Sequence, residues 1–170
     1  MGVTIHFEGQ LRDEAAYQRV VEAAARFATA SGWTSEPIAE PFVTLKRVRS
    51  EEDVDYEGPV KGIVLRPHEN ADPLRLEFDS DLYVQEYCKT QFAPAEIHLQ
   101  VIALLRQIES EFAQLAVEDE GEYWSTADRV ALEGHLATCS RALAELLTTD
   151  SGLRGPGRGP DDRIVDFYRE

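Results

Sequence analysis

The chain opens with a strict alternation of apolar and polar side chains. Over residues 3–9 (VTIHFEG) every second position is apolar, so a strand there would bury one face and leave the other wet. Asp13 then offers an N-cap, apolar residues recur at helical spacing behind it, and Ser31-Gly32 is a typical helix end. The pattern predicts a strand followed by an amphipathic helix.

The middle of the chain carries further strand signals. Residues 42–48 mix β-branched, aromatic and basic side chains behind Pro37 and Pro41, which is typical of an edge strand. Residues 60–65 (VKGIVL) are apolar on both faces apart from Lys61 and indicate an interior strand, whereas residues 74–79 alternate. The loop between them is long enough for a hairpin, so we expect these two strands to be antiparallel neighbours.

Two other stretches of the middle part, residues 50–59 and 82–92, have a less regular pattern of apolar and polar residues. Residues 50–59 are acidic and rich in turn formers, which predicts a loop. The aromatic side chains of residues 82–92 favour a strand, although Pro94 opens a helix directly afterwards.

From Pro94 onward the pattern is helical. The buried side of one continuous helix is predicted by an apolar stripe of Ile97, Val101, Leu104, Leu105, Ile108, Phe112 and Leu115. Residues 117–122 interrupt the stripe. Ser125 and Asp128 then form a variant capping box, which predicts the start of a third helix.

The order of these elements indicates the fold class. Strands come first and helices follow, which predicts an α+β fold with a mostly antiparallel sheet of about 4–5 strands and three helices packed on one face. After Thr149 the sequence becomes rich in glycine and proline. We therefore expect a single domain over residues 1–149 and a flexible tail over residues 150–170, whose end can dock back.

Composition narrows the class of protein. The 170 residues carry 32 acidic and 17 basic side chains, a formal net charge of −15, which argues against nucleic acid as a partner. No apolar run reaches the roughly 18–20 residues of a bilayer span, and the first residues lack the features of a signal peptide. Cys88 and Cys139 make no disulfide framework. We expect a cytoplasmic protein that does not bind a membrane.

Motifs for nucleotide, zinc-protease or dithiol chemistry are absent from the sequence. There is no glycine-rich phosphate loop, no G-x-S-x-G, no H-E-x-x-H and no C-x-x-C. We therefore assign no cofactor and no catalytic residue.

The polar face of the predicted sheet is the first candidate site. His6 and Glu8 lie on the wet side of one strand, and Arg75 and Glu77 lie on the wet side of another. A histidine beside carboxylates and an arginine can support acid–base chemistry or bind a charged ligand. The alternative is an ordinary solvated face held by cross-strand pairs.

Two further candidate sites lie near the predicted helix starts. Lys89 and Gln91, just ahead of Pro94, could hold an anion or simply form a turn. Glu120, Tyr123 and Trp124 belong to an acidic-aromatic segment, residues 118–124, that could bind a hard cation or a cationic ligand. The segment lacks the spacing of an EF-hand, so a solvated loop with core aromatics is the alternative.

Histidines offer a weak candidate for a metal. His98, Asp128 and His135 could meet if the second and third helices pair, but no histidines are spaced i,i+4. The alternative is hydrogen-bonded histidines at the edge of the core. We assign no metal.

Three segments in this order resemble an uncharacterised bacterial protein family: TIHFEG at 4–9, LRLEFDSDLYVQEYCKTQFAP at 74–94 and VEDEGEYW at 117–124. The resemblance covers residues 1–136. It implies a small cytoplasmic protein of no established activity and brings no site residues with it.

These observations favour a non-enzymatic binding or interaction module for a basic protein partner. The alternative is a small enzyme or ligand-binding domain that uses the polar sheet face or residues 118–124. The edge strand leaves a homodimer open, although Lys46, Arg47 and Arg49 resemble edge protection.

Overall fold

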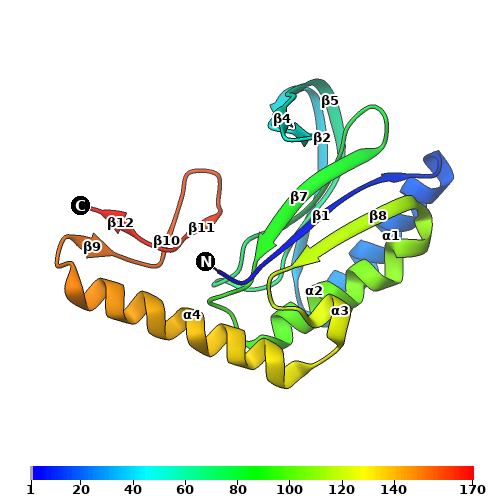
Figure 1. Ribbon diagram of the computed structural model, residues 1–170. Helices are drawn as coiled ribbons and strands as arrows, with labels where there is room; N and C mark the ends of the chain where they lie inside the picture. The colour runs from blue at the N-terminus through cyan, green and yellow to red at the C-terminus, as the bar shows by residue number, and fades with distance from the viewer. Residues whose placement is uncertain (1) are drawn as a thin grey trace.

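The computed structural model describes residues 2–170 and has an α+β fold (Figure 1). Two three-stranded antiparallel sheets, ordered β7-β1-β8 and β2-β5-β6, form its centre. The strands of these sheets are β1 (Thr4–Leu11), β2 (Thr34–Leu45), β5 (Tyr56–Arg66), β6 (Leu74–Phe78), β7 (Tyr83–Lys89) and β8 (Phe112–Asp119). The four helices described are α1 (Glu14–Ser31), α2 (Ala95–Ile108), α3 (Tyr123–Thr126) and α4 (Arg129–Thr149).

The two sheets meet where β6 turns into β7. The Asp79 N–H donates to the Tyr83 carbonyl at 3.0 Å, and β6 lies next to β7. β5 and β6 are antiparallel neighbours, as predicted, and residues 83–89 form the strand that the aromatic side chains favoured. The sheets therefore present one extended surface on each side.

Helices α1 and α2 lie behind this surface in Figure 1 and bury its apolar side. Ile5, Phe7 and Leu11 of β1 are at most 3% exposed, while His6 and Glu8 between them are exposed. The core also contains Phe78, whose ring centroid lies 6.3 Å from that of Phe112. The alternation of β1 thus separates a buried face from a helix-free face.

Helix α1 has the predicted ends. An Oδ1 atom of Asp13 accepts the Ala16 N–H at 2.7 Å, and Gly32 closes the helix in the left-handed conformation at φ 73°. Helix α4 contacts α2 and α3, and of its side chains Leu132 and Cys139 are buried. None of the helices in residues 2–170 combines the length and the apolar character needed to cross a bilayer.

Strand β2 is longer than the predicted edge strand. It begins at Thr34, pairs only with β5, and its register shifts between Glu40 and Val43, around Pro41. Proline is tolerated there because an edge strand needs hydrogen bonds on one side only. The chain leaves β2 at Leu45, so the predicted continuation to residue 48 was wrong.

Residues 48–53 form a small hairpin within the stretch predicted to be a loop. Its strands are β3 (Val48–Arg49) and β4 (Glu52–Asp53). Arg49 lies over the Tyr83 ring, with its guanidinium carbon 5.0 Å from the ring centroid. Arg47 and Arg49 therefore turn toward β7 instead of protecting the edge of β2, whereas Lys46 stays exposed and pairs with Asp55 at 2.8 Å.

The predicted second helix is too long. Helix α2 ends at Ile108, and after a 3-10 turn at Glu109–Glu111 the chain becomes strand β8. Phe112 and Leu115 match helical spacing, but strand pairing with β1 places Phe112 in the core as well. Phe112 and Leu115 fit both a helix and a strand, and the pairing of this segment with β1 makes it a strand.

The third long helix begins later than predicted. Asp128 caps α4, because an Oδ1 atom accepts the N–H groups of Val130 and Ala131 at 2.9 and 3.1 Å. Ser125 lies in the single turn α3, where its hydroxyl donates to the Glu122 carbonyl. The carboxylate of Asp128 also brings the negative charge that a helix N-terminus favours.

The last residues lie against the domain. Leu153 and Ile164 are buried, and the short strand pairs are β9 (Leu153–Arg154) with β12 (Tyr168–Arg169), and β10 (Gly157–Arg158) with β11 (Ile164–Val165). Lys89 Nζ lies 2.7 Å from Asp166 Oδ1 and ties this segment to β7. The division of the chain at residue 149 stays a prediction.

Candidate functional site

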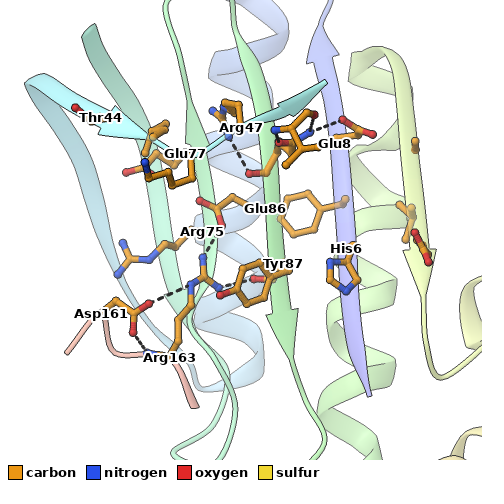
Figure 2. Close-up of a pocket in the computed structure, with 18 residues that line it drawn as sticks. His6, Glu8, Thr44, Arg47, Arg75, Glu77, Glu86, Tyr87, Asp161 and Arg163 are labelled. Carbon is orange, nitrogen blue, oxygen red and sulfur yellow. Dashed lines mark hydrogen bonds and ion pairs between the residues drawn. The ribbon is translucent and has the colours of Figure 1, made fainter. Parts of the chain in front are cut away.

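A hollow of about 1030 Å³ lies on the helix-free face of the sheets (Figure 2). Its floor comes from the polar sides of β1, β6, β7 and β8. One wall is residues 44–48, which comprise the end of β2 and the chain that follows it, and Asp161 and Arg163 from the C-terminal segment close another side. The central side chains are His6, Glu8, Arg75, Glu77, Gln85 and Tyr87.

The structure brings together the four residues of the predicted polar face. His6 and Glu8 come from β1, and Arg75 and Glu77 come from β6. Strand β7 lies between these two strands and places Tyr87 opposite His6 and Gln85 opposite Glu8. The four side chains therefore share one hollow from separate strands.

Glu8 is held as a charged acceptor on the floor. The Tyr83 hydroxyl donates to its Oε2 atom at 2.5 Å, and Gln85 Nε2 donates to the same atom at 2.9 Å. These two hydrogen bonds lower the pKa of Glu8. Burial and the bond to Glu8 raise the pKa of Tyr83 to about 12, so the phenol stays a donor.

Glu86 and Arg163 form a shielded ion pair at one end. Arg163 Nη2 lies 2.5 Å from Glu86 Oε2, and the two side chains are only 12% and 11% exposed. Arg163 also donates to the Tyr87 carbonyl at 2.8 Å and lies 3.9 Å above the Tyr87 ring. Burial raises the pKa of Glu86 in spite of the opposing charge of Arg163.

Two other arginines of the hollow are less completely paired. Arg47 is 3% exposed, and its Nη1 atom donates to the Gln85 carbonyl at 2.8 Å. Its Nε and Nη2 atoms have no hydrogen-bond partner within residues 2–170. Arg75 is half-buried and, over the same residues, makes no hydrogen bond or ion pair.

Of the candidates near the predicted helix starts, Gln91 and Glu120 hold the start of β1, and Lys89 pairs with the C-terminal segment. Gln91 Oε1 accepts the Val3 N–H at 3.1 Å, and Lys89 is paired with Asp166. Glu120 Oε2 accepts the Thr4 N–H at 2.8 Å, and its other oxygen lies 3.8 Å from His6 Nε2. The structure thus separates Lys89, Gln91 and Glu120 from the centre of the hollow.

The aromatic residues of the acidic-aromatic segment pack on the core. Tyr123 and Trp124 are partly buried against it, and the Arg106 guanidinium lies 3.4 Å from the Trp124 ring centroid. Tyr123, Trp124 and Glu120 are not among the residues that line the hollow.

The three weak metal candidates have separate partners. His98 is fully buried, with Nδ1 2.7 Å from Thr90 Oγ1 and Nε2 3.1 Å from Asp119 Oδ2. His135 lies 2.7 Å from Glu122 on the surface, and Asp128 caps α4. Over residues 2–170, His, Cys, Asp and Glu form no group of three placed to hold a metal ion.

Asp119 sits at the end of this buried chain of hydrogen bonds. Besides His98, it accepts the N–H groups of Gly121 and Trp124 at 2.8 and 2.9 Å. Burial alone would raise its pKa, but His98 and the two N–H donors outweigh burial and lower it. The chain of hydrogen bonds holds β8 to α2 inside the protein.

Sequence reasoning missed Arg47, Gln85, Glu86, Tyr87 and Arg163. Gln85, Glu86 and Tyr87 could have been found, because a strand over residues 82–92 was predicted and its polar side chains were candidates for the same face as His6 and Glu8. Arg163 had no such signal, since it reaches Glu86 across 77 positions of sequence.

Comparison with known proteins gave no match. No family model matches the sequence, and neither the curated proteins nor the solved structures give a match.

Proposed function

We propose that this protein is a non-enzymatic binding module and that the hollow on the helix-free face holds its ligand. The observation that carries the proposal is the gathering of charged side chains from four strands and two connecting segments around one volume of about 1030 Å³. A volume of this order fits a small molecule or the end of a peptide.

Electrostatics indicates the kind of ligand. The chain has a net charge of −15, yet four of its basic residues, Lys46, Arg47, Arg75 and Arg163, line the hollow. The β1–β8 side carries His6, Glu8 and Glu118 instead. A ligand with an anionic group at one end and hydrogen-bond donors at the other complements this arrangement.

The way the polar groups are held supports binding more than turnover. Glu8 and Glu86 are fixed by hydrogen bonds to neighbouring side chains, which preorganises them for recognition. The two cysteines, Cys88 and Cys139, lie outside the hollow. Burial raises the pKa of both thiols and keeps them protonated, so they are poor nucleophiles.

A thermal-shift screen against organic acids, phosphates, amines and amino acids tests the proposal. A true ligand at about 100 times its Kd adds roughly 2.7 kcal/mol, a rise in Tm of about 5–11 °C for a chain of this size. The rise should disappear in Arg75→Ala and persist in Arg26→Ala, which removes an arginine 70% exposed on α1. A ligand whose effect survives both in Arg75→Ala and in Arg47→Lys would contradict binding in the hollow.

A second candidate function is an interaction with a basic protein. The observation that favours it is a set of exposed acidic residues on β2, on the β3–β4 hairpin and at the start of β5: Glu36, Glu40, Glu51, Glu52, Asp53 and Glu57. Phe42 of β2 is also exposed, at 65%. Charge on an interface speeds association and makes it sensitive to salt. Association with a basic partner that does not weaken at high salt would count against this candidate.

A further inference from the structure

The most unusual polar group of the molecule is the guanidinium of Arg47. It is 3% exposed and lines the hollow, and its Nε and Nη2 atoms are shielded from solvent with no partner in residues 2–170. Buried donors without a partner cost free energy, and nearly all such groups in native proteins are satisfied. The position therefore lacks an acceptor.

The two unpaired atoms, Nε and Nη2, lie on one edge of the planar guanidinium. Nε–H and Nη2–H point in parallel, and this edge matches the two oxygens of a carboxylate or a phosphate. The remaining corner, Nη1, is held by the Gln85 carbonyl at 2.8 Å. The side chain is thus anchored at one corner and presents the opposite edge free.

Neighbouring acids do not fill this edge. Glu8 is occupied by Tyr83 and Gln85, and Glu86 is occupied by Arg163. The aromatic neighbour is Tyr83, whose ring centroid lies 5.6 Å from the guanidinium carbon. A buried positive charge without a hydrogen-bonded carboxylate is the setting in which an incoming anion gains most.

The hollow selects among anions by charge. Its lining carries five acidic residues (Glu8, Glu77, Glu86, Glu118 and Asp161) and the four basic residues named above. Each carboxylate group of a ligand brings one charge and two acceptor oxygens to the free guanidinium edge, whereas a dianionic phosphate brings two charges to the same place and meets more repulsion from the surrounding carboxylates.

We propose that the free edge of Arg47 is the subsite for a carboxylate group of the ligand. This inference rests on the proposed function and deepens it by naming the chemical class of the ligand. The carboxylate can belong to a small organic acid or to the C-terminus of a peptide, since both present the same two oxygens.

Entry to the subsite requires the wall of the hollow to shift. Lys46, Val48 and Arg49 on either side of Arg47 are exposed. This segment is held on β7 by Arg47 and by Gln85, which exchanges hydrogen bonds of 2.8 Å with the main chain of Val48. The carboxylate takes its place on Arg47 as these side chains move aside.

The direct test is an NMR titration of the arginine Nε–H signals of the full chain. Acetate and succinate should move the Arg47 Nε–H signal saturably while the Arg26 signal stays in place. Arg47→Lys should weaken succinate binding at least roughly tenfold, because lysine cannot offer two parallel donors. Arg26→Lys is the matched control and should change nothing.

Further probes separate the two sources of the carboxylate. A short peptide that binds more tightly than succinate, and only with a free C-terminus, assigns the subsite to a peptide end. Tighter binding of succinate assigns it to a small acid, and both outcomes support the inference. An unmoved Arg47 signal, an equal response to inorganic phosphate, or an equal response to the amidated peptide overturns it.

The wild-type titration does not depend on whether a variant folds. The outcomes also separate this inference from the proposed function. A ligand lost in Arg75→Ala but retained in Arg47→Lys shows that the hollow binds while Arg47 is not the subsite. A ligand retained in both variants refutes the two together.

Discussion

Removal of Arg163 should both destabilise the protein and release its C-terminal segment. Arg163 pairs with Glu86 at 2.5 Å, and both side chains are almost fully shielded from water. Arg163→Ala leaves the Glu86 carboxylate buried without its partner, and breaking such a pair costs about 3–5 kcal/mol. At about 2–4 °C per kcal/mol for a chain of this size, Tm falls by roughly 6–20 °C.

The lower end of this range is expected, because the segment that carries residue 163 can detach. Detachment lets water reach Glu86 and removes the cost of the buried charge. The free energy of unfolding lost in Arg163→Ala therefore cannot exceed the free energy that docks the segment. Trypsin should then cut more rapidly at Arg154 and Arg158, which lie in the same segment. Thermal denaturation followed by circular dichroism and timed proteolysis together measure both effects.

The effect should depend on pH in a defined direction. The folded-state pKa of Glu86 is raised above 4.5, so its buried charge costs stability at neutral pH, and the cost disappears as the pH falls below that ordinary value. While the segment stays docked, loss of Arg163 raises the pKa of Glu86 further, because burial remains and the opposing charge is gone. The deficit of Arg163→Ala should therefore be largest at neutral pH and shrink toward pH 4.

Two variants make this reasoning refutable. Arg169→Ala removes an arginine of the same segment that is 68% exposed, and it should change Tm little. Arg163→Met combined with Glu86→Gln removes both charges and should cost less than Arg163→Ala alone. If Arg163→Ala behaves like Arg169→Ala in Tm and in proteolysis, the ion pair does not hold the segment.

Three other substitutions test the buried framework. The lowered pKa of Asp119 gives stability that is present above pH 3.8 and is lost as the pH falls through the folded-state value. Asp119→Asn removes this contribution, so the urea midpoint should depend less on pH in acid. Gly62→Ala should lower the free energy of unfolding by about 3 kcal/mol or more, and Tm with it, because an added Cβ would lie 1.8 Å from the Leu76 carbonyl oxygen and Gly62 has φ 153°; an unchanged Tm would contradict this close approach. Asp13→Ala should cost about 1 kcal/mol, measured by urea denaturation, whereas Asp13→Ser should retain most of the cap of α1.

The first strand and helix could be predicted from the sequence, because the interactions that end the helix are made between residues close together in the chain. Asp13 and Gly32 act through neighbouring main-chain groups, so their roles can be read without tertiary context. Phe112 could not be placed in this way, since helical spacing and strand pairing both bury it, and only its pairing opposite Leu11 decides. Ser125 and Asp128 both fit the start of a helix, and the structure uses the second.

The candidate site was predictable to the extent that it lies on alternating strands. His6, Glu8, Arg75 and Glu77 follow from period-two patterns, and all four line the hollow. Arg47 could not be assigned to the site, because a basic residue on a predicted edge strand is typical of a protected edge. Its burial results from the turn of the chain onto β7, which no local pattern encodes.

The position of β1 in its sheet has a consequence for how the protein is made. β1 is the first strand of the chain, yet it is the central strand of its sheet, and its partners are β7 and β8. About a hundred residues separate β1 from β8, so at roughly 5–20 residues per second of synthesis β1 waits ~5–20 s for its second neighbour. During that time the nascent strand carries unpaired main-chain groups on at least one edge. The helix-free face that holds the hollow therefore completes late, after most of the chain has been synthesised.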